Sequence, residues 1–152
     1  MSASKASRQT AVTFKKVFLD ANILIDLFDS SRQSFHESKR IYTTLYQNDV
    51  TICTSCDIAT TVYYLTARSV NTKEALEAIE IINQTIHILP FGNDQIEQAI
   101  ALMRNAYRDF EDTLQYISAK ESGCEAIISN DKNFTAKDIP LFSSKEFVAK
   151  YL

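Results

Sequence analysis

The chain has 152 residues, of which 45% are apolar and 23% are charged, and it contains only two glycines and two prolines. This length and composition are typical of one helix-rich globular domain, and they argue against a disordered or linker-rich protein. The net charge of −3 excludes an overall basic surface, but it leaves room for a local basic patch that binds nucleic acid.

The first residues and the cysteines indicate the cellular compartment of the protein. The first ten residues, MSASKASRQT, are polar and lack the apolar stretch of a secretory signal. No run approaches the roughly 18 apolar residues that a membrane span needs. The three cysteines, an odd number, favour free thiols in a reducing compartment. We therefore expect a cytoplasmic protein without membrane contact, with residues 1–14 as a disordered tail and 15–152 as one domain.

Short apolar runs alternate along the chain with segments of helical periodicity. The expected strands cover residues 16–19, 50–53, 86–89, 125–129 and the neighbourhood of 141–142. The expected helices cover 22–29, 35–46, a segment capped by Ser55, a segment capped by Asn71, 94–104, 111–121 and a segment capped by Ser143. Gly123 suits a left-handed helix end. The alternation predicts an α/β fold, with a parallel sheet of about four to five strands and helices on both faces.

Four aspartates are placed where strands and helices meet. Asp20 follows the first strand, and Asp57 lies in the first helical turn after the second strand. Asp112 opens a helix that leads to the strand at 125–129, and Asp131 follows that strand. Because the carboxyl ends of parallel strands share one edge of a sheet, we expect these four carboxylates to converge there. Each also has an ordinary explanation as a helix cap or turn residue.

A cluster of carboxylates favours a metal site over four coincident caps, because like charges repel one another unless a cation lies among them. Mg²⁺ or Mn²⁺ fits a site made of oxygen ligands. Such an ion polarises a phosphodiester and lowers the pKa of a bound water. Asn22 and Ser129 lie beside Asp20 and Asp131, where they can orient ligands or a metal-bound water.

Three segments of the chain resemble the PIN domain, the fold of many small metal-dependent ribonucleases, among them the toxins of bacterial toxin–antitoxin pairs. They are VFLDANILIDLF, DFEDTLQYISAKESGCEAIISNDKNF and SSKEFV, and the resemblance extends from about Lys16 to Phe147. It implies a three-layer α/β/α fold with an acidic metal site. It also implies the following roles: Asp20, Asp112 and Asp131 as catalytic metal ligands, Asn22 and Ser129 as supporting residues, and Asp109 as an outer helper.

The sequence differs from the family pattern at the second acidic residue. PIN proteins usually carry it about two turns into the helix after the second strand, and this register falls near Thr60 or Thr61. Asp57 lies about one turn earlier on the same helical face and is a candidate replacement. Two alternatives stay open: an active nuclease that uses Asp57, or a degenerate PIN-like module that binds RNA or protein without cleaving it.

The resemblance implies a Mg²⁺- or Mn²⁺-dependent endoribonuclease, in which a metal-activated water hydrolyses the RNA phosphodiester. We expect basic side chains near the acidic site to contact the RNA, namely Arg32, Arg68, Arg108 and Lys132. A single-stranded or looped RNA fits such a site, because its backbone bends into a notch. The resemblance to toxins further implies an antitoxin partner and a homodimer.

One other motif points to a different chemistry. The segment CTSC, residues 53–56, places two cysteines in the C-x-x-C spacing of thioredoxin-like redox pairs, between a strand and a helix. The chain lacks the Trp-Cys-Gly-Pro character of that family. A thiol oxidoreductase is therefore the minor alternative.

Overall fold

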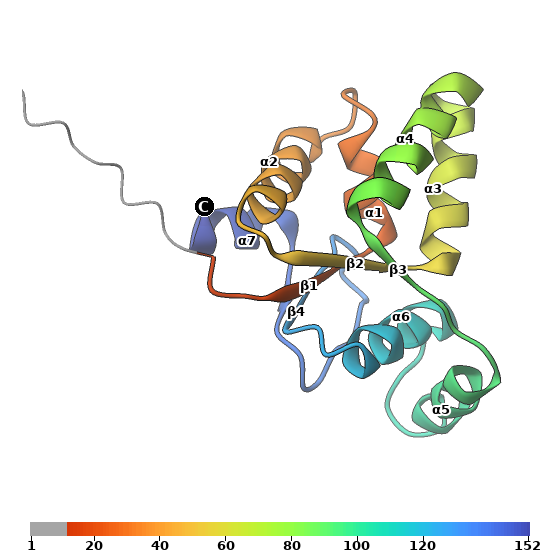
Figure 1. Ribbon diagram of the computed structural model, residues 1–152. Coiled ribbons are helices and arrows are strands. Elements are labelled where there is room, and N and C mark those ends of the chain that lie inside the picture. Colours follow the sequence, from red (N-terminus) through yellow and green to blue (C-terminus); the bar gives the residue numbers. More distant parts are fainter. Residues whose placement is uncertain (1–11) are drawn as a thin grey trace, which may run out of the picture.

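A parallel five-stranded sheet forms the centre of the computed structural model, which describes residues 12–152 (Figure 1). The strands are β1 (Lys16–Leu19), β2 (Thr51–Ser55), β3 (His87–Leu89), β4 (Ala126–Ile128) and β5 (Leu141–Phe142). Their order is β3-β2-β1-β4-β5, and each neighbouring pair is parallel. The predicted α/β fold with a parallel sheet is therefore confirmed.

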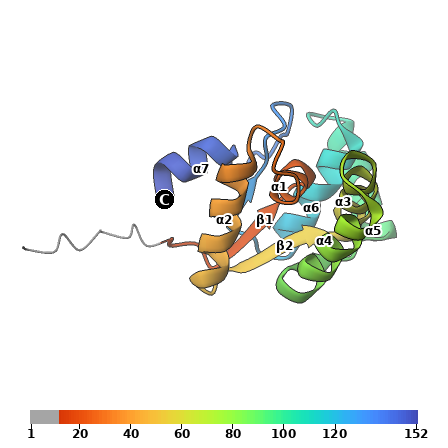
Figure 2. The same cartoon turned by 90° about the horizontal axis from the view of Figure 1, so that it is seen from above.

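Helices cover both faces of this sheet (Figures 1 and 2). They are α1 (Ala21–Leu27), α2 (Phe35–Gln47), α3 (Cys56–Ser69), α4 (Thr72–Thr85), α5 (Asn93–Met103), α6 (Phe110–Glu121) and α7 (Ser144–Tyr151). In Figure 1, α5 and α6 lie below the sheet and the other helices lie above it. This is the three-layer arrangement that the sequence predicts. None of the helices in residues 12–152 combines the length and the apolar character that a bilayer crossing requires.

Local hydrogen bonds end the elements close to the predicted positions. The Ser55, Asn71 and Ser143 side chains cap α3, α4 and α7, and Gly123 has the left-handed φ of +76° after α6. Strand β2 continues two residues beyond its predicted end. Because Ser55 pairs with Leu89 of β3 before it caps α3, the sheet reaches directly to the helix that carries Asp57.

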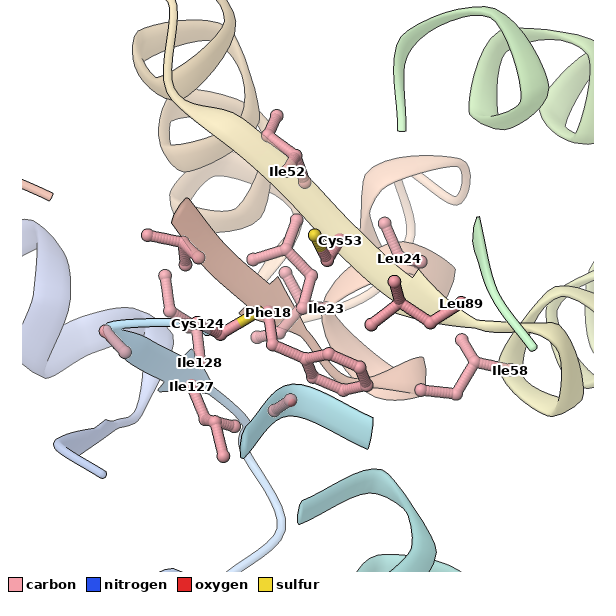
Figure 3. Close-up of a cluster of buried hydrophobic side chains, with 14 of the residues drawn as sticks. Phe18, Ile23, Leu24, Ile52, Cys53, Ile58, Leu89, Cys124, Ile127 and Ile128 are labelled. Atoms are coloured by element: carbon pink, nitrogen blue, oxygen red, sulfur yellow. The ribbon is translucent and has the colours of Figure 1, made fainter. Parts of the chain in front are cut away.

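The core fixes the strand ends from both faces. Phe18 and Ile127 are fully buried, and Ile23 and Leu24 of α1 pack into the same cluster (Figure 3). Each such side chain contributes about 1.5–3 kcal/mol by leaving water. The residues that follow β1 and β4 therefore start from a rigid base.

The predicted disordered tail covers residues 1–14, of which 1–11 lie outside the described residues. Phe14 packs against the C-terminal helix, with its ring centroid 5.1 Å from that of Tyr151. It also contacts the rings of Phe142 and Phe147. The last residue of the predicted tail thus joins β5 and α7 in one aromatic cluster.

Candidate metal centre

The first carboxylate of the site, Asp20, is held at the carboxyl end of β1. Its backbone N–H donates to the Ile128 carbonyl of β4, 3.0 Å away, and only 6% of the residue is exposed. Its Oδ1 accepts from the Ala21 N–H at 2.8 Å, and its Oδ2 accepts from the Ser129 hydroxyl at 2.6 Å. Burial raises the pKa of Asp20, and the charges of Asp131 and Asp109 act in the same direction.

Ser129 joins Asp20 to the turn that carries Asp131. The Asp131 N–H donates to the Ser129 Oγ at 3.1 Å, so one hydroxyl contacts both aspartates. Asn22 strengthens the same connection, because its Oδ1 accepts from the Asn130 N–H at 3.1 Å. The two predicted supporting residues therefore tie the loop after β4 to the start of α1.

The first turn of α6 carries Asp112, the third carboxylate of the site. Asp109 caps the helix, and its Oδ1 accepts from the Asp112 N–H at 2.8 Å. Burial raises the pKa of Asp112 to about 8, and the charges of Asp109, Asp20 and Asp131 add to this rise. A hydrogen bond with Asp131 favours the protonated form of Asp112 as well. The structure thus brings together Asp20, Asp112 and Asp131, which are distant in the sequence.

Asp57 approaches the cluster from α3. Its Oδ2 accepts from the Nε2 of Gln115, a buried residue of α6, at 3.4 Å. Thr60 and Thr61 supply no acid, and their hydroxyls donate to the backbone oxygens of Cys56 and Asp57 one turn earlier. The carboxylate on the α3 side of the site is therefore Asp57.

Sequence reasoning missed Glu111, which lies in the first turn of α6 beside Asp112. Burial raises the pKa of Glu111, followed by the charges of Asp57, Asp20 and Asp109. Glu111 is therefore near both the α3 carboxylate and the β1 carboxylate. Its place in the same helical turn as Asp112 was the available signal in the sequence.

Six acidic residues thus belong to this part of the molecule, and we call them the acidic edge: Asp20, Asp57, Asp109, Glu111, Asp112 and Asp131.

The acidic edge suits a hard divalent cation by its chemistry. Its donors are carboxylate oxygens, the ligands that Mg²⁺ and Mn²⁺ prefer. The two ion pairs within residues 12–152 join Arg32 to Asp26 and Lys120 to Asp138, so neither neutralises the acidic edge. The repulsion that raises the pKa of Asp112 is the kind that a cation relieves.

The side chains are not arranged as a finished cage. Across the described part of the chain, no three Asp, Glu, His or Cys side chains stand together in a position to hold an ion. Asp20, Asp109 and Asp131 each accept a hydrogen bond from a nearby backbone N–H group. These bonds leave further lone pairs on the carboxylates, so ion binding would require the side chains to move together and not to give up every hydrogen bond.

The four predicted RNA-contacting residues lie in different settings. Arg32 pairs with the buried Asp26 and lines a hollow of about 430 Å³ together with Asn22 and Asn130. Arg32 and Arg68 line a second hollow of about 380 Å³. Arg108 and Lys132 are exposed, and they directly precede Asp109 and follow Asp131. Arg108 and Lys132 thus adjoin the acidic edge in the chain, whereas Arg68 lies in the last turn of α3, at the other end of that helix from Asp57.

The cysteines do not form the local pair that the CTSC motif predicts. Cys53 is buried inside β2, whereas Cys56 begins α3, and both are free thiols. A hydrogen bond with Cys124 lowers the pKa of Cys53 to about 7. The partner of Cys53 is thus Cys124 near β4, which does not favour a C-x-x-C redox centre.

Comparison with known proteins gives a consistent result. Residues 17–140 match the PIN domain family. The chain is 39% identical to Ribonuclease VapC1 of Aquifex aeolicus over 139 residues, which cover 90% of this chain and 96% of that protein.

Solved structures share the fold. VapC20 of Mycobacterium tuberculosis, described as a toxin that cleaves the sarcin-ricin loop, aligns with a TM-score of 0.67 at 20% identity, over 78% of this chain and 92% of that one. A toxin–antitoxin complex from Klebsiella pneumoniae aligns with a TM-score of 0.64 at 21% identity, over 84% and 97% of the two chains.

Proposed function

The chain belongs to the PIN domain family, and we propose that it is a Mg²⁺- or Mn²⁺-dependent endoribonuclease that uses the acidic edge. The observation that carries the proposal is the meeting of Asp20, Asp112 and Asp131, none of which forms an ion pair within residues 12–152. A purely structural role does not account for this meeting, because burial of mutually repelling carboxylates is unfavourable. The name and the 39% identity of the Aquifex ribonuclease support RNA as the substrate.

Each part of the acidic edge has its own task in this proposal. Asp20, Asp112 and Asp131 hold the ion, directly or through water, and Asp57 adds a carboxylate from α3. A bound ion supplies Lewis acidity and a lowered pKa for water. Ser129 and Asn22 orient Asp20 and the turn after β4 through their hydrogen bonds. Asp109 holds the first turn of α6, and Glu111 adds negative charge between the two groups.

The basic residues bind the substrate in the same proposal. We expect Arg108 and Lys132 to contact phosphates on either side of the scissile bond, since they are exposed and adjoin Asp109 and Asp131 in the chain. Arg32 and Arg68 extend this path along the two hollows beside α1. The reaction is hydrolysis, in which water attacks phosphorus and the bond to the leaving oxygen breaks.

We also propose that the protein is the toxin of a toxin–antitoxin pair, that it forms a homodimer, and that it acts in the cytoplasm. The antitoxin is supported by relatives of the same fold, among them the Klebsiella toxin–antitoxin complex and VapBC-1 of Haemophilus influenzae, which aligns with a TM-score of 0.59. The three free cysteines are consistent with a reducing compartment. Co-purification of the chain with the product of an adjacent gene tests the partner.

A second candidate is a PIN-like module that binds without cleaving. It is favoured by the threonines at the usual second acid position and by the absence of a ready ligand trio in residues 12–152. The two candidates differ in metal binding. Mg²⁺ at about 100 times its dissociation constant stabilises a protein with a true site by roughly 2.7 kcal/mol, whereas the module would gain nothing.

The direct experiment is RNA cleavage with Mn²⁺ added, by the wild type and by Asp20→Asn. The proposal predicts cleavage by the wild type and little by the variant. Asp94→Asn is the matched control, because Asp94 is also an acid in the first turn of a helix, α5, and is not part of the acidic edge. Cleavage at the same rate by the wild type and Asp20→Asn would exclude the assignment.

A further inference from the structure

Phe110 is an exposed aromatic residue that lies between Asp109 and Glu111 of the acidic edge in the chain. It is the first residue of α6, and 43% of it is exposed, whereas the residues from Thr113 to Ala119 in the same helix are buried. Single exposed apolar residues are common on protein surfaces, so exposure alone has no meaning. The location of Phe110 is more informative, because its neighbours in the chain are Asp109 and Glu111.

The backbone on both sides of Phe110 is held firmly. Tyr107 is buried and stacks on Tyr116 of α6, with 5.1 Å between the ring centroids. On the other side, Asp109 caps the helix through its side chain, and its carbonyl accepts from the Thr113 N–H at 3.0 Å. The exposed phenyl ring therefore stands on a well-ordered helix start. Less conformational entropy of the protein is then lost when a ligand binds.

The charges around Phe110 restrict what binds there. Consecutive Cα atoms are about 3.8 Å apart, so the backbone of Phe110 adjoins that of two acidic residues. These carboxylates repel a phosphate, whereas a nucleobase is neutral and has a flat apolar face. Arg108, two residues earlier, offers a cation for the backbone of the same nucleotide strand. An aromatic ring stacks on any base, because every base has a π-face.

We propose that Phe110 is a stacking platform for an unpaired nucleobase of the RNA that enters the acidic edge. The inference rests on the proposed function and adds a subsite to it. In a duplex the bases are stacked on each other and are not available to the ring, so the platform selects single-stranded or looped RNA. Phe110 is then a specificity-determining residue, and it takes no part in holding the metal.

A fluorescent variant tests this subsite. The chain has no tryptophan, so Phe110→Trp introduces a single indole at the site. The probe is a single-stranded 2′-O-methyl RNA hexamer, and in a series of such hexamers each position in turn carries an abasic sugar. We expect the intact hexamer to quench the Trp fluorescence and the abasic sugar at one position to abolish the quenching. Equal quenching by every hexamer in the series would overturn the proposal.

Binding affinities give the second measurement. Phe110→Ala should weaken binding of the intact hexamer by about 5- to 100-fold, the range of base–aromatic stacking. Phe110→Tyr should restore it, and Ile100→Ala is the control, because Ile100 of α5 is 45% exposed and lies outside the acidic edge. The abasic sugar that abolishes quenching should weaken binding by the wild type but not by Phe110→Ala.

Two results would contradict the inference and are distinguishable from each other. If the wild type cleaves RNA while Phe110→Ala binds the hexamer as tightly as the wild type does, the subsite alone is wrong, and the ring is then free to contact a protein partner. If the wild type neither cleaves RNA nor binds the hexamer, the subsite and the proposed function both fail.

Discussion

Two buried aspartates near β1 are satisfied in opposite ways. Asp20 and Asp26 are 6% and 4% exposed and lie at the two ends of the short helix α1. Asp26 forms an ion pair with Arg32. Asp20 accepts hydrogen bonds from the Ala21 N–H and the Ser129 hydroxyl, which are neutral, and the charges that raise its pKa belong to other aspartates.

This difference agrees with a structural role for Asp26 and with the functional role that we propose for Asp20. The charge of Asp26 is balanced within the protein, so its pair with Arg32 fastens the loop after α1. The charge of Asp20 is not balanced by any ion pair within residues 12–152, and Asp131 and Asp109 increase the imbalance. Buried charge without a counter-ion is unfavourable, which supports our proposal that the acidic edge binds a cation from solution.

The largest expected effect is on catalysis. Asp112→Asn should lower Mn²⁺-dependent RNA cleavage by about 100-fold or more, because loss of a group that only orients a metal ligand already costs about 10- to 100-fold. Initial rates on a single-stranded RNA measure this. Asp94→Asn, in the first turn of α5, should cleave at the wild-type rate, and an equal loss in both variants would show that the acidic edge is not special.

The two kinds of aspartate also predict stability changes of opposite sign in metal-free protein. Arg32→Ala should lower the free energy of unfolding by about 1–2 kcal/mol, less than for a fully buried pair because the Arg32 side chain is 41% exposed. Asp112→Asn should raise it by roughly 0.5–1 kcal/mol at neutral pH, because asparagine is uncharged in both states and folding no longer has to bind a proton at this position. Urea unfolding with a chelator present measures both. Destabilisation by both substitutions would remove the contrast between Asp20 and Asp26.

A smaller effect tests whether Asp57 belongs to the site. Asp57→Asn should lower the cleavage rate by about 10-fold, less than Asp112→Asn, because Asp57 lies on the α3 side and is held through Gln115. Metal titrations of the rate should show a weaker apparent affinity for Mn²⁺. An unchanged rate and affinity would assign Asp57 to capping α3 alone.

The last prediction is a dependence of stability on pH. The pKa of Asp112 is about 8 in the folded protein against an ordinary value of 3.8, so the native state keeps a proton that the unfolded chain has lost. The free energy of unfolding of the metal-free protein should therefore fall as the pH rises from about 4 to about 8. Unfolding measured at intervals from about pH 4 to pH 8 should give a flatter profile for Asp112→Asn. Parallel profiles would show that Asp112 titrates normally.

The sequence predicted that Asp20, Asp112 and Asp131 come together, because the topology alone brings their elements to one place. Asp20 and Asp131 follow strands that lie side by side in a parallel sheet, so their meeting requires only the correct strand assignment. Asp112 is placed by its position at the start of the helix that leads to β4. These relations depend on local patterns, which hydrophobic periodicity and capping residues reveal.

Other features depend on how helices dock and were not predictable from local patterns. The contact of Asp57 with Gln115 joins α3 to α6 across 58 residues of sequence. The proximity of Glu111 to both Asp57 and Asp20 arises from the same docking. The CTSC motif misled for a related reason, because the strand buries Cys53 and brings it to Cys124 instead of Cys56.

The most direct test of the account is to measure Mn²⁺ binding by the wild type and by Asp20→Asn. Electron paramagnetic resonance, without RNA, detects the Mn²⁺ that stays free in solution. The account predicts that the wild type depletes the signal of free Mn²⁺ in a saturable way and that Asp20→Asn does so far more weakly. A wild type that leaves the free-ion signal unchanged, or a variant that binds as tightly as the wild type, would contradict it.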